Sequence, residues 1–365
     1  MKFSVARSRL LDALQTVQNV VSGKSTMQIL QNALICAKGN RITVTTTDLD
    51  LSESSAIDLA GEVESAGEVT LPVKKLSSAV RELAEDTVTF DIDGNDIARV
   101  KCGTTSFKIS GLPARDFPPV PAAEGDFHYT LERAHLRDML RKTAYAVSQD
   151  ETRRALNGVL LSFKDGKLVV VATDGRRLAL VERDVDFPAG EEHDFILPVK
   201  AVNELQRVLD GEGDVRIFPK QSQLVFSWDQ NLLASKLIDA TYPNYAMVIP
   251  QNCEEKAVID REAFLTAIRR ASVMANDRAS GIRFDFAPNQ LKVYSVENET
   301  GTGSDSLPIK YAGKEISLLL NPDYLSEPLR VLDDDEVSFE MSEGSKPTLL
   351  KCGEPFLHVL MPLRS

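Results

Sequence analysis

The chain has 365 residues, of which 43% are hydrophobic and 26% are charged, an ordinary composition for a globular protein of two or three domains. No run of 18 apolar residues occurs, and residues 1–7 lack the apolar stretch of a signal peptide. We therefore expect a cytoplasmic protein with no membrane contact. Lys and Arg number 42 against 54 acidic residues, and the net charge of −12, taken alone, argues against a nucleic-acid-binding protein.

The cysteines and histidines do not suggest a cross-linked or metal-binding protein. Cys36, Cys102, Cys253 and Cys352 stand far apart, with no CxxC pair and only four histidines to join them. This spacing argues against a disulfide scaffold and against a zinc site. We expect buried or half-buried thiols, and no metal or cofactor.

The sequence contains a long internal repeat. Residues 70–83 recur as residues 196–209 and, more faintly, as residues 319–332. Thr47-Asp48 is matched by Thr173-Asp174, and Phe117-Pro118 by Tyr242-Pro243. A period of about 125 residues is far above the 20 to 50 residues of solenoid repeats, so it indicates duplicated domains. The chain is predicted to hold three similar domains, at residues 1–122, 127–250 and 254–365.

Each repeat is predicted to open with an amphipathic helix, at residues 6–17, 133–147 and 261–275, because apolar residues recur there at spacings of three and four. Hairpins follow, with turns at residues 39–40, 165–166 and 288–289. The recurring segment forms a second helix, and further strands close the unit. The predicted fold class is therefore α+β, with two helices and antiparallel sheets in each domain.

Catalytic motifs are not found. Residues 23–26 imitate the end of a phosphate-binding loop, but Gln18 stands where that loop needs its first glycine. The sequence has no G-x-S-x-G or H-E-x-x-H, and its histidines are scattered. The acidic run at residues 333–336 is expected to be a solvated turn. Asp174 with Arg176 and Arg177 is the best polar cluster for an enzyme, and it lacks a nucleophile or metal set, so we expect no catalysis.

Several segments carry a resemblance to a known family: residues 1–3 (Met-Lys-Phe), 156–158, 172–179, 235–239 with Tyr242-Pro243, and 361–364. On these the whole chain resembles the beta subunit of bacterial DNA polymerase III, the sliding clamp family. The resemblance implies DNA-clamp domains in a head-to-tail dimeric ring that encircles double-stranded DNA without reading its sequence. It also implies that the ring holds the polymerase III alpha subunit, clamp-loader subunits and other replication or repair proteins, and that a separate ATP-driven machine loads it.

A basic inner face is compatible with the negative net charge, because a ring need be electropositive only where it faces DNA. In the family the repeated helices line the hole, and three of them are net positive here. The predicted DNA contacts on these helices are Arg137, Arg141, Lys200, Arg207 and Arg269. Family positions in loops add Lys24, in the loop after the first helix, and Gln149, Arg153 and Arg154, in a second loop that is one residue longer here. The alternative is that these cations merely solvate an outer helix face.

The resemblance also implies a pocket for short hydrophobic peptides between the second and third domains. An apolar cleft with a few polar groups suits such anchors. Its predicted lining is Leu156, Thr173, Gly175, Arg176, Arg177, Leu178, Pro243, Val248, Asn321, Tyr324, Val359, Met361, Pro362 and Leu363. Met247 and Ser365 depart from the family pattern and leave the peptide preference open.

The resemblance places a dimer seam at Phe107 and Ile109 of the first domain, with Lys75 nearby, against Val273 and Met274 of the third domain of the other subunit. The alternative for these apolar residues is an ordinary core. For the protein as a whole, the alternative function is a repeat-built cytoplasmic scaffold that never meets DNA. That alternative explains the acidic charge and leaves the basic helices unexplained.

Overall fold

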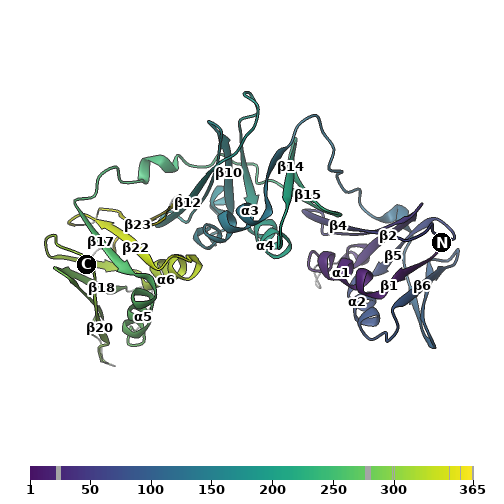
Figure 1. Ribbon diagram of the computed structural model, residues 1–365, viewed down its shortest axis with the longest axis horizontal. Coiled ribbons are helices and arrows are strands. Elements are labelled where there is room, and N and C mark those ends of the chain that lie inside the picture. The colour runs from purple at the N-terminus through teal and green to yellow at the C-terminus, as the bar shows by residue number, and fades with distance from the viewer. Residues whose placement is uncertain are drawn as a thin grey trace. The chain divides into compact units, whose positions relative to one another are not determined.

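The computed structural model describes residues 1–21, 26–275, 281–297, 299, 301–344, 346–353 and 355–363. Its elements run three times through the same order: one strand, one helix, four strands, a second helix and three strands (Figure 1). This order confirms the repeat and the α+β class predicted from the sequence. The first copy consists of β1 (Lys2–Ala6), α1 (Arg7–Val17), β2 (Asn32–Lys38), β3 (Arg41–Thr47), β4 (Leu51–Asp58), β5 (Gly67–Pro72), α2 (Val73–Arg81), β6 (Thr87–Ile92), β7 (Ile97–Cys102) and β8 (Thr105–Ser110).

The other two copies follow the same pattern. The second consists of β9 (Tyr129–Glu132), α3 (Arg133–Arg141), β10 (Gly158–Lys164), β11 (Lys167–Thr173), β12 (Arg177–Asp184), β13 (His193–Pro198), α4 (Val199–Val208), β14 (Asp214–Lys220), β15 (Gln223–Trp228) and β16 (Asn231–Lys236). The third consists of β17 (Glu255–Asp260), α5 (Arg261–Ser272), β18 (Ile282–Ala287), β19 (Gln290–Ser295), β20 (Ser304–Pro308), β21 (Ile316–Leu320), α6 (Pro322–Val331), β22 (Glu336–Met341), β23 (Thr348–Cys352) and β24 (Phe356–Leu360). Short 3-10 turns lie at Gln28–Gln31, Ala114–Asp116, Ala144–Ala146, Arg154–Asn157 and Tyr245–Val248.

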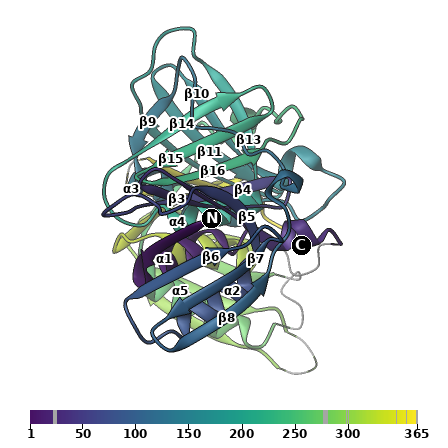
Figure 2. The same ribbon diagram turned by 90° about the vertical axis from the view of Figure 1, so that its right-hand side faces the viewer.

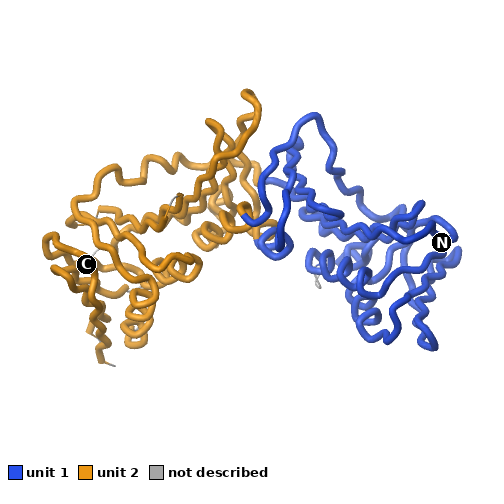
Figure 3. The backbone as a smooth tube through the Cα atoms, in the orientation of Figure 1, with its two compact units in different colours: residues 1–134, 203–237 blue, residues 135–202, 238–365 orange. Residues whose placement is uncertain are grey.

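The chain forms two compact units that do not coincide with the three repeats (Figure 3). Unit 1 holds residues 1–134 and 203–237, and unit 2 holds residues 135–202 and 238–365. The middle repeat is divided between them, since β9 and β14 to β16 belong to unit 1 while β10 to β13 belong to unit 2. Each unit therefore combines one terminal repeat with half of the middle one.

Each unit contains one eight-stranded and one four-stranded antiparallel sheet. In unit 1 the long sheet has the order β5-β2-β3-β4-β16-β15-β14-β9, and the short one β1-β6-β7-β8, whose strands β6, β7 and β8 run side by side in Figure 2. In unit 2 the orders are β13-β10-β11-β12-β24-β23-β22-β17 and β20-β19-β18-β21. The repeats meet where β4 pairs with β16 and where β12 pairs with β24. Consecutive repeats thus share a continuous sheet.

The helices form where the apolar periodicity predicts them, with shorter ends. In α1 the buried residues Leu10, Ala13, Leu14 and Val17 recur at three- and four-residue spacings. The predicted helix at 133–147 ends at Arg141: the Thr143 hydroxyl donates to the carbonyl of Met139 (2.8 Å), and a separate turn follows. The predicted helix at 261–275 likewise ends at Ser272.

The hairpin turns confirm the sequence pattern. Strands β10 and β11 are joined by Asp165 and Gly166, both with positive φ (52° and 70°), as a tight two-residue turn requires.

All four cysteines are free, with Cys102 and Cys352 buried and the other two partly buried. Within the described part of the chain, no helix is long and apolar enough to cross a membrane.

A buried carboxylate lies where the first two repeats meet in unit 1. Glu53 on β4 is fully buried, and neither of its carboxyl oxygens accepts a hydrogen bond from the described residues. The nearest cation is Arg207, whose Nη2 lies 3.6 Å from Glu53 Oε2. Burial, and next the repulsion from Glu204, raise the pKa of Glu53 well above its ordinary value.

This buried acid makes stability depend on pH. Between the unfolded-state pKa of about 4.3 and the higher folded pKa, the unfolded chain loses this proton first, so wild-type stability falls as pH rises through that window. Glu53→Gln removes this loss. We expect the thermal midpoint of the variant to exceed that of the wild type by an amount that grows with pH, to a few degrees near pH 8.

Thermal unfolding of both proteins between pH 4.5 and 8 measures the effect. Glu62→Gln, at an exposed carboxylate of the same unit, is the control and should give a constant difference. A constant difference for Glu53→Gln as well would show that this carboxyl titrates normally in the folded protein.

Candidate functional site

A tight turn before β12 forms one wall of the predicted pocket in unit 2. The Thr173 hydroxyl donates to the carbonyl of Arg177 (2.6 Å) and accepts from the amide of Gly175 (3.1 Å). Asp174 Oδ1 accepts from the amides of Arg176 (2.8 Å) and Arg177 (3.0 Å). Gly175 has φ of 85°, which favours glycine. Thr and Asp at these two positions therefore fix the backbone through local side-chain bonds.

The same turn occurs in the first repeat, as the sequence match of Thr47-Asp48 predicts. Asp48 Oδ1 accepts from the amides of Asp50 (3.1 Å) and Leu51 (2.8 Å), and the Thr47 hydroxyl accepts from the amide of Leu49 (3.0 Å). Leu49 has φ of 80° at the position of Gly175. The turn is thus a property of the repeat, and the residues on it differ between the copies.

An apolar surface lies beside this turn. Leu178 and Val359 are directly paired across β12 and β24, and both belong to a cluster on one face of the sheet. The segment 238–250 crosses this face, where Tyr242 and Tyr245 pack against the cluster. Its side chains Met247 (82% exposed) and Val248 (49% exposed) remain in solvent, as does Met361 (41%) beyond β24. Exposed apolar side chains next to an apolar cluster form a surface that suits a hydrophobic ligand.

The carboxy-terminal residues are held against the turn and against the third repeat. The amide of Met361 donates to the carbonyl of Arg176 (3.0 Å), and the amide of Leu363 donates to the carbonyl of Leu319 (2.8 Å). A Cβ on Gly281 would come within 2.6 Å of the Leu363 side chain, so this glycine makes room for the tail. The predicted pocket residues of the turn, the strands and the tail are therefore brought together in unit 2.

Three predicted pocket residues have structural tasks that the sequence analysis missed. Asn321 caps α6, since its side chain accepts from the amide of Asp323 (2.9 Å). The Arg177 side chain is only 8% exposed and is paired with Asp174 and Glu327. Its Cζ also lies 4.5 Å from the ring centroid of Tyr324. Arg176, by contrast, is exposed and leaves its charge at the surface.

The missed partners come from distant segments. Glu327 on α6, which the sequence analysis does not single out, is a counterion of Arg177. His358, one of the four histidines that are scattered in the sequence, is fully buried on β24. A histidine within the otherwise apolar run Phe356–Leu360 was the one signal that could have found it.

The predicted DNA contacts are exposed or partly exposed wherever the structure describes them. Arg137 and Arg141 lie on α3, Lys200 and Arg207 on α4, Arg269 on α5, and Gln149, Arg153 and Arg154 in or beside the loop before β10. Lys24 lies outside the described residues.

Some of these cations have acidic or carbonyl partners. Arg141 donates to Asp138 Oδ1 (2.8 Å) and pairs with Asp333, and its hydrogen bond holds the pKa of Asp333 below its usual value. Residues 333–336 are all exposed, as expected of a solvated turn, and Asp333 adds an ion pair with Arg141 to it. Arg207 pairs with Glu204, and Arg153 Nη1 donates to the carbonyl of Asp174 (3.2 Å).

The predicted residues of the dimer seam lie on an edge strand in unit 1 and just after a helix in unit 2. Phe107 and Ile109 lie on β8, at the edge of the four-stranded sheet of unit 1, and both are partly buried against its core. Lys75 is exposed on α2. In unit 2, Val273 directly follows α5 and is 77% exposed, which is unusual for a large apolar side chain, and Met274 is partly buried.

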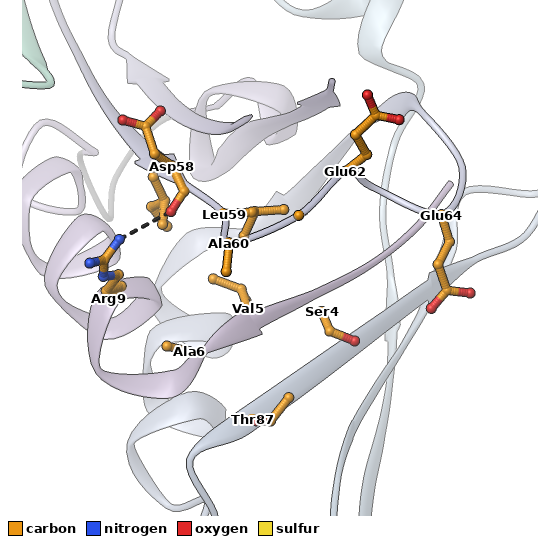
Figure 4. Close-up of a pocket in the computed structure, with 12 residues that line it drawn as sticks. Ser4, Val5, Ala6, Arg9, Asp58, Leu59, Ala60, Glu62, Glu64 and Thr87 are labelled. Atoms are coloured by element: carbon orange, nitrogen blue, oxygen red, sulfur yellow. Dashed lines mark hydrogen bonds between the residues drawn. The ribbon is translucent and has the colours of Figure 1, made fainter. Parts of the chain in front are cut away.

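A cavity of about 590 Å³ lies in unit 1, away from every predicted site residue (Figure 4). Arg9 Nη1 donates to the carbonyl of Asp58 (3.0 Å) at this cavity. Two of its three acidic side chains, Asp58 and Glu64, are already paired, with Arg41 and Lys2 respectively, and Glu62 is the third. The cavity therefore offers no converging set of free groups for chemistry.

Comparison with known proteins gives the same family along the entire chain. Models of the N-terminal, central and C-terminal domains of the DNA polymerase III beta subunit match residues 1–121, 130–244 and 246–364. The beta sliding clamp of Pseudomonas putida is 32% identical over 368 residues, covering 100% of both chains, and that of Chlamydia muridarum is 28% identical over 100% of this chain and 99% of the relative.

Solved structures agree. The DNA polymerase III beta subunit of Pseudomonas aeruginosa superposes with a TM-score of 0.95 at 30% identity over 100% of both chains. The sliding clamp of Bartonella birtlesii, solved bound to griselimycin, gives a TM-score of 0.93 at 32% identity, again over 100% of both. The chain therefore belongs to the family of the DNA polymerase III beta subunit, the beta sliding clamps.

Proposed function

We propose that the chain works as a ring-shaped homodimer that encircles duplex DNA in the cytoplasm and tethers the replicative polymerase to it, without catalysing a reaction itself. The observation that carries this proposal is the match of the complete threefold architecture to solved sliding clamps, with a TM-score of 0.95 over 100% of the chain. The functional domains are proposed to be residues 1–122, 127–250 and 254–365.

The electrostatics suit a tether that slides. The chain carries a net charge of −12, so attraction to DNA must be local. Exposed cations such as Arg137, Lys200 and Arg269 supply contacts to phosphates, which position a protein without reading sequence. Arg141 and Arg207 are partly neutralised by Asp333 and Glu204, which keeps these contacts weak. Weak, sequence-independent contacts allow movement along the duplex.

The topological claim can be tested directly. We expect the protein, loaded with a clamp loader and ATP, to remain on a nicked circular plasmid through gel filtration and to be lost once the plasmid is cut to linear form. The reason is that a closed ring leaves DNA only at an end. Equal retention on both forms, or none with a competent loader, would instead favour a protein scaffold.

The proposed ring closure would extend a pairing pattern that is already present in the fold. The last strand of one repeat pairs with the fourth strand of the repeat before it: β16 with β4, and β24 with β12. Two such strands remain, β8 of the first repeat and β20 of the third, and each is an edge strand in its described sheet. Pairing β8 of one subunit with β20 of another, beside Phe107, Ile109, Val273 and Met274, would complete the same pattern and close a twofold ring.

Charged substitutions should open this seam. Replacing Val273 and Met274 with Asp is expected to give a folded monomer in analytical ultracentrifugation, because burying two carboxylates in an apolar interface is strongly unfavourable. Val248→Asp, an exposed valine away from the proposed seam, should stay dimeric. Persistence of the dimer in the double variant would remove the seam assignment.

The second proposed surface binds partners. The apolar cluster around Leu178 and Val359, with Val248 and Met361 exposed beside it, is proposed to take short hydrophobic peptides from the polymerase alpha subunit, the clamp loader and other replication or repair proteins. The sliding clamps of Pseudomonas aeruginosa and Bartonella birtlesii have been solved bound to griselimycin, which makes that compound a practical probe.

A charge in this surface should weaken binding. We expect Val248→Asp to weaken binding of griselimycin, and of a fluorescent peptide with adjacent Leu and Phe, by at least about tenfold in a polarisation assay, because a carboxylate would be desolvated. Leu49→Asp is the matched control: Leu49 is also exposed, on the equivalent turn of the first repeat. Equal loss in both variants, or no loss in the first, would contradict the assignment.

A further inference from the structure

Behind the proposed pocket lies a buried polar network centred on Arg177. Each of the three guanidinium nitrogens has a partner: Nε meets Asp174 Oδ2 (3.0 Å), Nη1 pairs with Glu327, and Nη2 donates to the carbonyl of Tyr145 (2.7 Å). The guanidinium also faces the rings of Tyr324 and Tyr145, with Cζ at 4.5 and 5.6 Å from their centroids. All three guanidinium nitrogens of Arg177 are therefore bound within the protein, and the side chain links the turn to α6.

His358 connects the two tyrosines that contact Arg177. Its Nδ1 lies 3.1 Å from the hydroxyl of Tyr145, and its Nε2 lies 3.1 Å from the carbonyl of Tyr324. A carbonyl only accepts, so Nε2 carries the proton and Nδ1 accepts from the tyrosine hydroxyl. Burial, and next the charge of Arg177, lower the pKa of His358 to about 3, so the ring is neutral at physiological pH and this tautomer is kept.

The network and the pocket wall lie on opposite faces of one pair of strands. Side chains alternate along a strand, and Leu178 and Val359 belong to the apolar cluster on one face. Their neighbours Arg177 and His358 therefore point to the other face. The network thus fixes the pocket from behind, without any part of His358 lying in the apolar cluster itself.

Two elements of the pocket depend on this network for their position. Tyr324 of α6 is held through its carbonyl by His358 and through its ring by Arg177. The turn at 173–176 is held through Asp174, and the carbonyl of Arg176 on that turn holds the amide of Met361. Removing the imidazole would leave a buried hydroxyl and a buried carbonyl without their partner, which is costly enough to make them move.

We propose that His358, acting with Tyr145, is a positioning residue that keeps the partner-peptide pocket preformed when it is empty; this inference rests on the pocket proposed above. A preformed pocket accepts a ligand at nearly every productive encounter. If the network is broken, only a fraction of the molecules are competent, and the apparent affinity falls by that fraction. The loss appears in the association rate, because the bound complex is unchanged.

The test uses full-length protein and the fluorescent peptide with adjacent Leu and Phe, measured by stopped flow. His358→Leu is expected to slow association about tenfold and to leave the dissociation rate unchanged. Tyr145→Phe, which removes only the hydroxyl, should give a smaller slowing in the same direction and guards against a folding failure of the first variant. His358→Gln, whose amide can donate to the carbonyl of Tyr324, should recover part of the rate.

The controls separate this inference from general destabilisation and from the pocket itself. Val337→Ala on β22 truncates another buried side chain of the third repeat and should lower the thermal midpoint without slowing association. Wild-type association in both network variants, a change confined to dissociation, or equal slowing by Val337→Ala would overturn the role of His358. Unchanged binding in Val248→Asp would overturn the pocket, and the inference with it; binding lost there but normal in His358→Leu would overturn the inference alone.

Discussion

Pairing between strands of successive repeats is the constraint on which the rest of this structure depends. A repeat that ended at its own last strand would leave a row of unpaired backbone groups at a sheet edge. Instead β16 adds to β4 and β24 adds to β12, so that each long sheet contains eight strands. The second pairing places Val359 directly opposite Leu178 and brings the carboxy-terminal tail to the turn at 173–176. The proposed partner surface is therefore a consequence of how two repeats join.

The repeats share one backbone scaffold, and the residues that differ between the copies distinguish the proposed partner surface from the equivalent region of the first repeat. The first and second repeats carry the same Thr-Asp turn with the same hydrogen bonds. Leu49 and Asp50 occupy it in one copy, and Asp50 there pairs with Lys236. Gly175 and Arg176 occupy it in the other, where they lie beside an apolar cluster. One backbone design thus carries an exposed ion pair at one junction and lies beside an apolar cluster at the next.

Many charged side chains in this protein are paired with opposite charges close by. The overall balance is acidic, and several cations on the predicted DNA-facing helices are paired with carboxylates of their own unit, as Arg141 is with Asp333. Buried charges follow stricter rules. Arg177 is surrounded by partners, and an unpaired buried guanidinium would be unfavourable. Glu53, by contrast, accepts no hydrogen bond from the described residues and has a raised pKa. Burial of a charged group thus gives a fully paired Arg177 at one junction and a titratable Glu53 at the other.

The sequence by itself determined the threefold repeat, the α+β class, the hairpin turns and the family, because each of these is written in local periodicity or in contiguous motifs. It also marked the strands of the proposed pocket, since the family motifs there are contiguous segments. It overestimated the helix at 133–147: beyond Lys142 the amides of Thr143 and Ala146 bond to carbonyls three residues back instead of four, and a 3-10 turn replaces the α-helix. Only the tertiary structure decided the partners of Arg177 and His358. Tyr145 and His358 are 213 residues apart in the chain, and no local pattern encodes a contact that exists only after β24 has paired with β12.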